Sequence, residues 1–362
     1  MAIHSISFPA GQESGSTAAS SNRNVLIFMI TGNPGLIDYY EPFLSALRTL
    51  LDSSAASKGT RFHIYGQDLA GFNDADHEPF SAANPPRDVA YQVNYLFKTL
   101  SEFRIQDEDS PKKGQPFDEV ILVGHSVGTY LILQLFHKLL RAPETARHLR
   151  LKTGILLFPT IEHIRHSPSG QRMELLRKAG PMLESNAHLL AWAFLRLWPY
   201  AALLWVITTV LGQPPAAAEV TARWLKSRDG VWQALHMGLD EMRVIGEDQW
   251  DEELWEIERE DRAQILKEKK QQQQIAAAGG EEKAASNNGS GSLPPKFFFF
   301  FGKDDHWVAN HFRDAFIERR QKQAERTRLM VDEGNLPHAF CIHHSEVVAE
   351  KVASWINELY AS

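Results

Sequence analysis

The sequence is poor in cysteine and in clustered basic residues, and its first 24 residues hold no long apolar run. One cysteine, Cys341, among 362 residues excludes a framework of internal disulfide bonds and indicates a reducing compartment. The net charge of −7 gives no support for nucleic-acid binding, which favours clustered Lys and Arg. Residues 1–24 are polar and rich in Ser, Ala and Gly, so they predict a flexible N-terminal tail and not a secretory signal.

Much of the chain alternates between strand and helix patterns. Val25–Ile30 is a continuous apolar run that ends in turn residues, which is typical of a strand buried on both faces. Alternation of this kind favours an α/β fold, with a mostly parallel central sheet covered by helices on both faces. The further strands are expected at 62–65, 119–123, 153–158, 297–301 and 328–331, and the helices at 40–53, 88–103, 127–140, 312–326 and 346–359.

The middle of the chain breaks this alternation with a strongly apolar segment at 189–211. The segment is long enough to cross a bilayer, which takes ~20 apolar residues, but Arg196 and Pro199 interrupt it. We therefore expect two helices or a hairpin meeting at Pro199. The segment can enter one leaflet of a membrane or droplet surface, pack as a cap over the site, or do both, and a true membrane span is the remaining alternative.

These patterns divide the chain into a core in two parts, 25–165 and 296–362, separated by two insertions. Residues 166–265 are expected to form a helical cap or membrane-associating insertion. Residues 266–295 are expected to be a disordered, low-complexity insertion, because a tract rich in Gln, Ala, Gly and Ser cannot bury enough apolar surface. The highly charged segment 248–270, which spans the junction of the two insertions, predicts a solvated helix.

A G-x-S-x-G motif, Gly124-His125-Ser126-Val127-Gly128, lies between a predicted strand and a predicted helix. The two glycines let strand and helix pass closely, through a sharp turn that holds the serine in a strained conformation. The N-terminus of the following helix can stabilise a developing oxyanion. The motif therefore predicts Ser126 as a nucleophile, with a helix-capping serine as the alternative. The His125 side chain is expected to pack beneath the turn.

A nucleophilic serine needs a histidine base and a carboxylate that orients it. In folds with this motif the acid and then the histidine follow the serine along the chain. Two aspartates come after the strand predicted at 297–301, and we favour Asp305 over Asp304 because a Gly-x-x-Asp spacing is typical of the acid. His338 lies after the next strand and before the last helix, where the base is expected.

The oxyanion hole is expected to combine the backbone N–H of Val127 with one from the loop after the first buried strand. Pro34 in that loop has no N–H, so Asn33 is the expected donor, with a plain turn as the alternative. The neighbouring Tyr39 and Tyr40 can line an acyl pocket or belong to the core. The sequence offers no His/Glu cluster at metal-ligand spacing, so neither a metal nor a cofactor is expected.

With these residues assembled, the chain resembles the lipid-droplet-associated hydrolase family. The resemblance implies an α/β-hydrolase fold with a helical, apolar cap, and a place on lipid droplets and the endoplasmic reticulum. It also implies cleavage of neutral-lipid esters such as triacylglycerol or sterol ester. The motifs that carry it are Gly32-Asn33-Pro34-Gly35 with Tyr39-Tyr40, the serine motif, Phe158-Pro159-Thr160-Ile161 with Ser167-Pro168-Ser169-Gly170, Asp305-x-Trp307 and His338-Ala339-Phe340.

The resulting hypothesis is a cytosol-facing serine ester hydrolase, a lipase or esterase, that works through an acyl-enzyme. Its expected partners are a lipid ester and a lipid surface contacted through 189–211. Two alternatives stay open: a droplet-organising protein with little turnover, and an acyltransferase or thioesterase that uses the same residues. The sequence favours no particular lipid ester, acyl length or oligomeric state.

Overall fold

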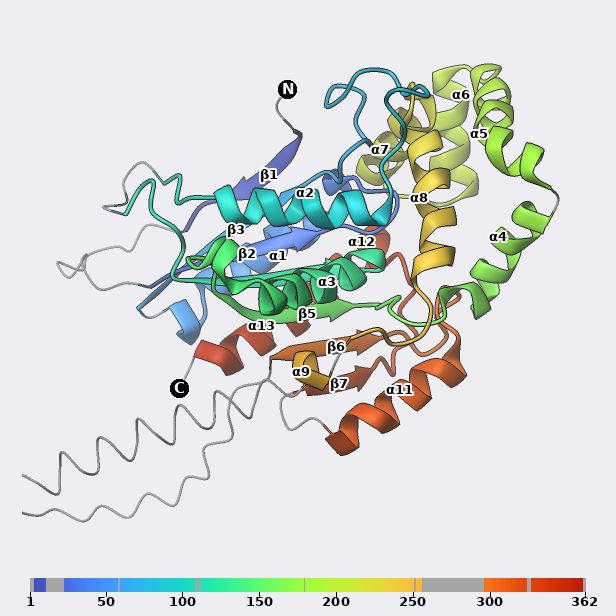
Figure 1. Cartoon of the computed structure of the whole chain (residues 1–362). Helices are drawn as coiled ribbons and strands as arrows, with labels where there is room; N and C mark the ends of the chain where they lie inside the picture. The colour runs from blue at the N-terminus through green and yellow to red at the C-terminus, as the bar shows by residue number, and fades with distance from the viewer. Residues whose placement is uncertain are drawn as a thin grey trace, which may run out of the picture.

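The structure, a computed structural model, describes residues 3–10, 23–57, 59–107, 110, 112–178, 180–250, 252–255, 296–323 and 327–360. Within them a seven-stranded sheet has the order β1-β3-β2-β4-β5-β6-β7 (Figure 1). Every neighbouring pair is parallel except β1 with β3, which confirms the predicted sheet. The strands are β1 (Ser5–Phe8), β2 (Arg23–Ile30), β3 (Thr60–Gln67), β4 (Glu119–His125), β5 (Leu151–Leu157), β6 (Phe297–Phe301) and β7 (Thr327–Val331).

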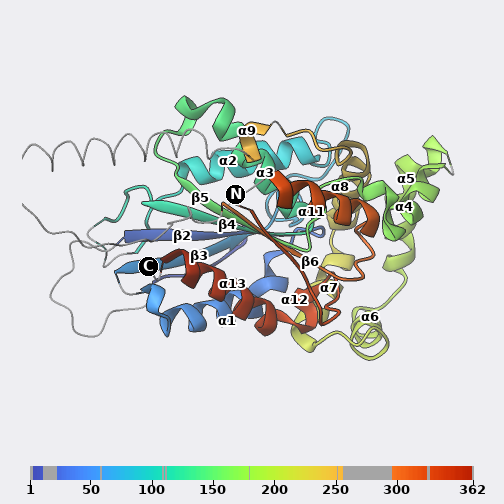
Figure 2. The same ribbon diagram turned by 90° about the horizontal axis from the view of Figure 1, so that it is seen from below.

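Helices cover both faces of this sheet (Figure 2). On one face lie α1 (Glu41–Asp52) and α13 (Ser345–Tyr360). The other face carries α2 (Val89–Glu102), α3 (Val127–Arg141), α9 (Glu252–Trp255) and α11 (Asn310–Gln323). Short helical segments join these elements at Ile37–Tyr40, Ala55–Ser57, Pro143–Ala146, Ile164–His166 and Phe340–His343, the last being α12.

The continuous apolar runs of the central strands supply both layers of the core. Successive side chains of a strand point to opposite faces, so a strand buried on both faces must be apolar at every position. In β6 the odd-numbered phenylalanines pack in the α3-side cluster, and Phe298 and Phe300 pack with α13. All five are at most 4% exposed.

The insertion forms a helical cap at the carboxyl ends of the strands (Figure 1). It contains α4 (Pro168–Lys178), α5 (Pro181–Arg196), α6 (Tyr200–Trp205) continued by a π-helical turn at Val206–Val210, α7 (Pro215–Lys226) and α8 (Gly230–Val244). As expected, the apolar segment is broken at Pro199, which caps the N-terminus of α6.

None of the described helices is by itself long and apolar enough to cross a bilayer. The pair Asn186–Arg196 and Tyr200–Val210 has the required length and composition together, but it is bent by 100° at the break.

Two expectations differ from the structure. Part of the predicted N-terminal tail is ordered: Ser5–Phe8 forms the edge strand β1, because its backbone pairs with β3 and the side chains of Ile6 and Phe8 pack on the core. In the predicted solvated helix, Leu254 and Trp255 of α9 are buried, and Trp255 lies 5.7 Å from Phe297 between ring centroids. The predicted disordered tract at 266–295 lies outside the described residues.

Candidate active site

Ser126 lies at the turn between β4 and α3 with φ 55° and ψ −127°. This positive φ is strained for a residue with a side chain. A Cβ on Gly124 would lie 2.8 Å from the backbone of Gly128, and a Cβ on Gly128 would collide with the carbonyl oxygen of Ile30. Both positions therefore require glycine, because strand, turn and helix pass too closely for a side chain.

The structure brings Ser126, His338 and Asp305 into one hydrogen-bonded chain. The Oγ of Ser126 is 2.9 Å from Nε2 of His338, and Nδ1 of His338 is 2.7 Å from Oδ2 of Asp305. The carboxylate can only accept, so Nδ1 carries the proton and the lone pair on Nε2 faces the serine hydroxyl. This is the orientation that general-base removal of the serine proton requires.

The two aspartates after β6 have different surroundings. Asp305 is buried, and its other oxygen accepts the backbone N–H of Trp307 at 2.8 Å. Burial alone would raise the pKa of Asp305, but the charge and hydrogen bond of His338 and the Trp307 N–H outweigh it and lower that pKa. Asp304 is exposed to solvent. Of the two, Asp305 is the one bonded to His338.

The loop after β2 offers the N–H of Asn33 to an oxyanion. Gly32 donates its N–H to the Tyr40 hydroxyl at 3.0 Å, and Pro34 has none. Within the described residues, the backbone N–H groups of Asn33 and Val127 have no protein acceptor. These are the two donors that the sequence indicated.

His125 ties the elements around the serine together. Its Nε2 is 2.8 Å from the carbonyl oxygen of His338, and its Nδ1 is 2.7 Å from the Tyr40 hydroxyl. A carbonyl only accepts, so Nε2 carries the proton and Tyr40 donates to Nδ1. Burial lowers the pKa of His125 to about 3, so the ring stays neutral. Its expected place beneath the turn is the one observed, and its partners join the Gly32 loop to the His338 loop.

Ser126 opens into a cavity of about 450 Å³ between the core and the cap. The walls are largely apolar and come from α4, α7 and α8 as well as from the core loops. A concave apolar site with a few convergent polar groups is typical of a small-molecule pocket. The apolar lining side chains include Tyr39, Met173, Trp224, Val231, Leu235, Trp307 and Ile342.

Sequence reasoning missed four polar residues of this pocket, Gln213, Thr221, Glu241 and His306. His306, which follows Asp305 in the sequence, lines the pocket with its ring centroid 5.9 Å from that of His338, and its Nδ1 is 2.9 Å from the Ser169 hydroxyl. Glu241 of α8 also lines the pocket, although it is 208 positions from its partner Asn33. The charge pattern of a helix does not show which core loop the helix will contact, so no sequence signal marked Glu241.

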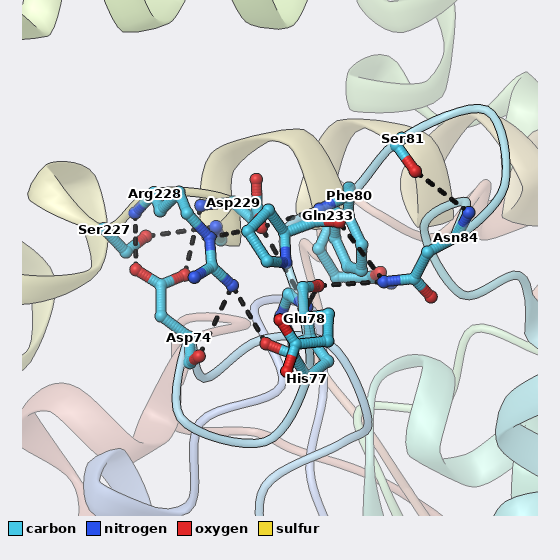
Figure 3. Close-up of polar contacts among 12 residues, drawn as sticks. Asp74, His77, Glu78, Phe80, Ser81, Asn84, Ser227, Arg228, Asp229 and Gln233 are labelled. Carbon is cyan, nitrogen blue, oxygen red and sulfur yellow. Dashed lines mark hydrogen bonds and ion pairs between the residues drawn. The ribbon is translucent and has the colours of Figure 1, made fainter.

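The described residues also bring together three possible metal ligands away from Ser126, namely Asp74, His77 and Asp229, with ligand atoms within 4.8 Å of one another (Figure 3). The spacing along the chain gave no hint, because Asp74 and Asp229 are 155 positions apart. Arg228 already binds both carboxylates of this group: its Nε donates to Asp229 at 2.8 Å, and its backbone N–H donates to Asp74. The cluster therefore links the loop after β3 to the start of α8, and we assign no metal to it.

The sheet order, the serine turn and the helical cap define the α/β-hydrolase class. Among solved structures, the chain is similar to a haloalkane dehalogenase variant from Bradyrhizobium elkanii, with TM-score 0.51 and 15% identity over 100% of this chain and 96% of that one. It is also similar to an epoxide hydrolase of the α/β-hydrolase superfamily from hot-environment metagenomes, with TM-score 0.52 and 13% identity over 98% and 95% of the chains. At such identities these likenesses establish the fold.

Sequence comparison narrows the class to a family. The family model described as lipid-droplet associated hydrolase matches residues 23–341. A lipid droplet-associated hydrolase from Mus musculus is 26% identical over 92% of this chain and 84% of its own length, and one from Dictyostelium discoideum is 22% identical over 94% and 90%. The chain belongs to the lipid-droplet associated hydrolase family, and it is a hydrolase with the α/β-hydrolase fold.

Proposed function

We propose that this hydrolase is a serine ester hydrolase that cleaves neutral-lipid esters, such as triacylglycerol or sterol ester, at lipid droplets. The observation that carries the proposal is the chain of hydrogen bonds from Ser126 through His338 to Asp305 at an apolar cavity. The family name and the resemblance support the droplet surface, together with the cytosolic face of the endoplasmic reticulum, as the place of action.

The geometry supports an acyl-enzyme mechanism. Ser126 Oγ attacks the ester carbonyl carbon while its proton passes to His338 Nε2, and Asp305 stabilises the imidazolium. The Val127 and Asn33 N–H groups bind the oxyanion. The carbon–oxygen bond to the alcohol then breaks, and His338 returns the proton to the leaving oxygen. A water molecule next gives a proton to His338 and attacks the acyl carbon. The bond from that carbon to Ser126 Oγ then breaks, His338 returns the proton to Oγ, and the fatty acid leaves.

The exposed apolar side chains of α5 and α6 are the proposed contact with the lipid surface. Soluble proteins rarely expose contiguous apolar patches of this kind, and Trp and Tyr favour the membrane–water boundary. A bent helix pair can lie in a droplet's monolayer, where a spanning helix would leave its far end in lipid. We call this set the apolar hairpin patch: Leu189, Leu190, Trp192, Phe194, Leu197, Trp198, Tyr200, Trp205, Val210 and Leu211.

The test of the proposal is fatty-acid release from emulsified triacylglycerol and sterol ester by the purified full chain. Ser126→Ala should lower kcat on the order of 10⁴–10⁶-fold, because it removes the nucleophile. Ser53→Ala, at an exposed position after α1, is the matched control and should act like wild type. The emulsion that is hydrolysed faster identifies the ester class.

Two results would redirect the proposal. If folded, droplet-bound wild type releases no acid and does not react with a serine-directed fluorophosphonate, a droplet-organising role replaces ester hydrolysis. If it reacts with the probe and transfers the acyl group to an added alcohol or thiol faster than to water, the chain is an acyltransferase. If water is the acceptor but thioesters are cleaved faster than oxygen esters, it is a thioesterase.

A further inference from the structure

Asn33, the proposed oxyanion donor, is held by the cap. Its side-chain amide donates to the carbonyl oxygen of Ala234 and to Oε1 of Glu241, each at 3.0 Å. Both acceptors belong to α8 and lie about two helical turns apart, so they share one face of the helix. The position of the Asn33 side chain is therefore set by α8, across the cavity that contains Ser126.

Gly238 lies between the two acceptors and faces the Asn33 amide. A Cβ at Gly238 would be 3.5 Å from Nδ2 of Asn33, which is an ordinary van der Waals contact, and 2.9 Å from the terminal methyl of the flexible Met173 side chain. This stretch of α8 therefore packs directly against the Asn33 side chain.

Glu241 is an unusual residue for this place. It is 4% exposed, and it lines the same apolar cavity as Ser126. A buried carboxylate without a cation is costly, so such a group takes a proton instead. Burial raises the pKa of Glu241 to about 8, although the hydrogen bond from Asn33 acts in the opposite direction. At neutral pH the side chain is therefore mostly a neutral carboxylic acid.

We propose that Glu241 is a positioning residue: it fixes the Asn33 side chain, and through it the Asn33 backbone N–H, so that the cap completes the oxyanion hole. This inference rests on the proposed ester hydrolysis. The neutral acid accepts the Asn33 hydrogen bond through its carbonyl oxygen and places no negative charge near the reacting carbonyl.

Turnover should depend on pH through the ionisation of Glu241. As pH rises through about 8, Glu241 loses its proton, and a negative charge then opposes the developing oxyanion. Asp240 on the same helix further raises the pKa of Glu241. Among the described residues, His306 and His338 are ionisable groups of the same pocket, and the charge of Arg172 of α4 acts on His306. Burial keeps the remaining ionisable groups of the pocket neutral near pH 8, namely Tyr39, Tyr40, His125 and Cys341.

The experiment compares Glu241→Gln and Glu241→Leu in the full chain, with a soluble p-nitrophenyl ester between pH 6 and 10. Gln keeps the acceptor and cannot ionise, so its kcat at pH 7 should stay within about threefold of wild type and the decrease above pH 8 should disappear. Leu removes the acceptor, so kcat should fall about 10²-fold with little change in KM, as for loss of an oxyanion donor. Asp240→Asn, the matched comparison, leaves Glu241 ionisable but removes a charge that raises its pKa, so the alkaline decrease should remain and move to lower pH.

The inference is overturned if wild type and Glu241→Gln share one alkaline limb, or if Glu241→Leu keeps full kcat. A second readout does not depend on turnover: the ¹⁵N amide resonance of the Asn33 side chain should titrate near pH 8 in wild type and be flat in Glu241→Gln. If wild type is inactive and that titration is present, the proposed function fails while the Glu241–Asn33 coupling stands. If the titration is absent, the coupling itself is wrong.

Discussion

The two ends of the helical cap differ in how they are held. Helix α8 is fastened to the core by side-chain bonds: Gln233 bonds both the N–H and the carbonyl of Arg87, and Asp240 accepts the N–H of Val89 at 3.0 Å. The hairpin of α5 and α6 instead exposes large apolar side chains, with Leu197 81% and Trp205 60% exposed. Its inner side packs on α7 through a small cluster separate from the main core.

This difference indicates a division of work within one insertion. Polar anchors fix direction and distance, which suits α8 because it supplies the pocket wall and holds Asn33. Apolar burial is not directional and scales with area, which suits a surface that contacts fluid lipid. We therefore expect changes in α8 to alter the chemical step, and changes in the apolar hairpin patch to alter only attachment to lipid.

The largest expected effect comes from charging the apolar hairpin patch. Leu197→Asp combined with Trp205→Asp should lower partitioning onto triacylglycerol droplets by about 10²-fold or more, since each buried apolar side chain contributes about 1.5–3 kcal/mol. Flotation with phospholipid-coated droplets measures this partitioning, and kcat on a soluble ester should not change. Val347→Asp, at a 53% exposed apolar position of α13, is the control. If Val347→Asp lowers droplet partitioning equally, the apolar hairpin patch is not the specific contact with lipid.

A smaller effect, on stability and kcat and not on lipid attachment, is expected from loss of the Gln233 bonds that hold α8 to the core. Gln233→Met leaves the N–H and carbonyl of Arg87 without their partner and should destabilise the fold by about 1–3 kcal/mol. Urea unfolding measures the stability. The position of α8, which contacts Asn33, is then less fixed, so kcat on a soluble ester should fall while droplet partitioning stays unchanged. Gln249→Met, at an exposed position beyond α8, is the control; similar losses there would show that the anchor is not specific.

The sequence predicted those parts of the molecule that local patterns specify. The runs Val25–Ile30 in β2 and Phe297–Phe301 in β6 are apolar at every position, as strands buried on both faces must be. The serine turn likewise requires glycine two residues before and two residues after Ser126. Pro199 marked the break in the apolar segment because proline cannot continue a helix with its full set of hydrogen bonds.

What the sequence left open depends on contacts between distant segments. The bond between Asn33 and Glu241 joins positions 208 apart, and it exists only because α8 packs over the loop after β2. The edge strand β1 has four residues with weak apolar alternation, so its pairing with β3 supplies the order that its own pattern does not. The many charges of 248–270 predicted a solvated helix, and they gave no sign that Trp255 packs on Phe297 and Phe299 of β6.

The smallest expected effect tests whether the two ends of the cap are independent. Lys226 at the end of α7 donates to the carbonyl oxygens of Leu195 and Trp198, just before the bend at Pro199. Lys226→Met should destabilise the end of α5 by about 0.5–1.5 kcal/mol, seen as faster amide exchange there, because these carbonyls lose a charged donor. Lys98→Met on α2, an exposed position, is the control. Turnover of a soluble ester should not change; a fall in kcat like that of Gln233→Met would mean that a disturbance of the hairpin reaches the pocket wall and that the cap acts as one unit.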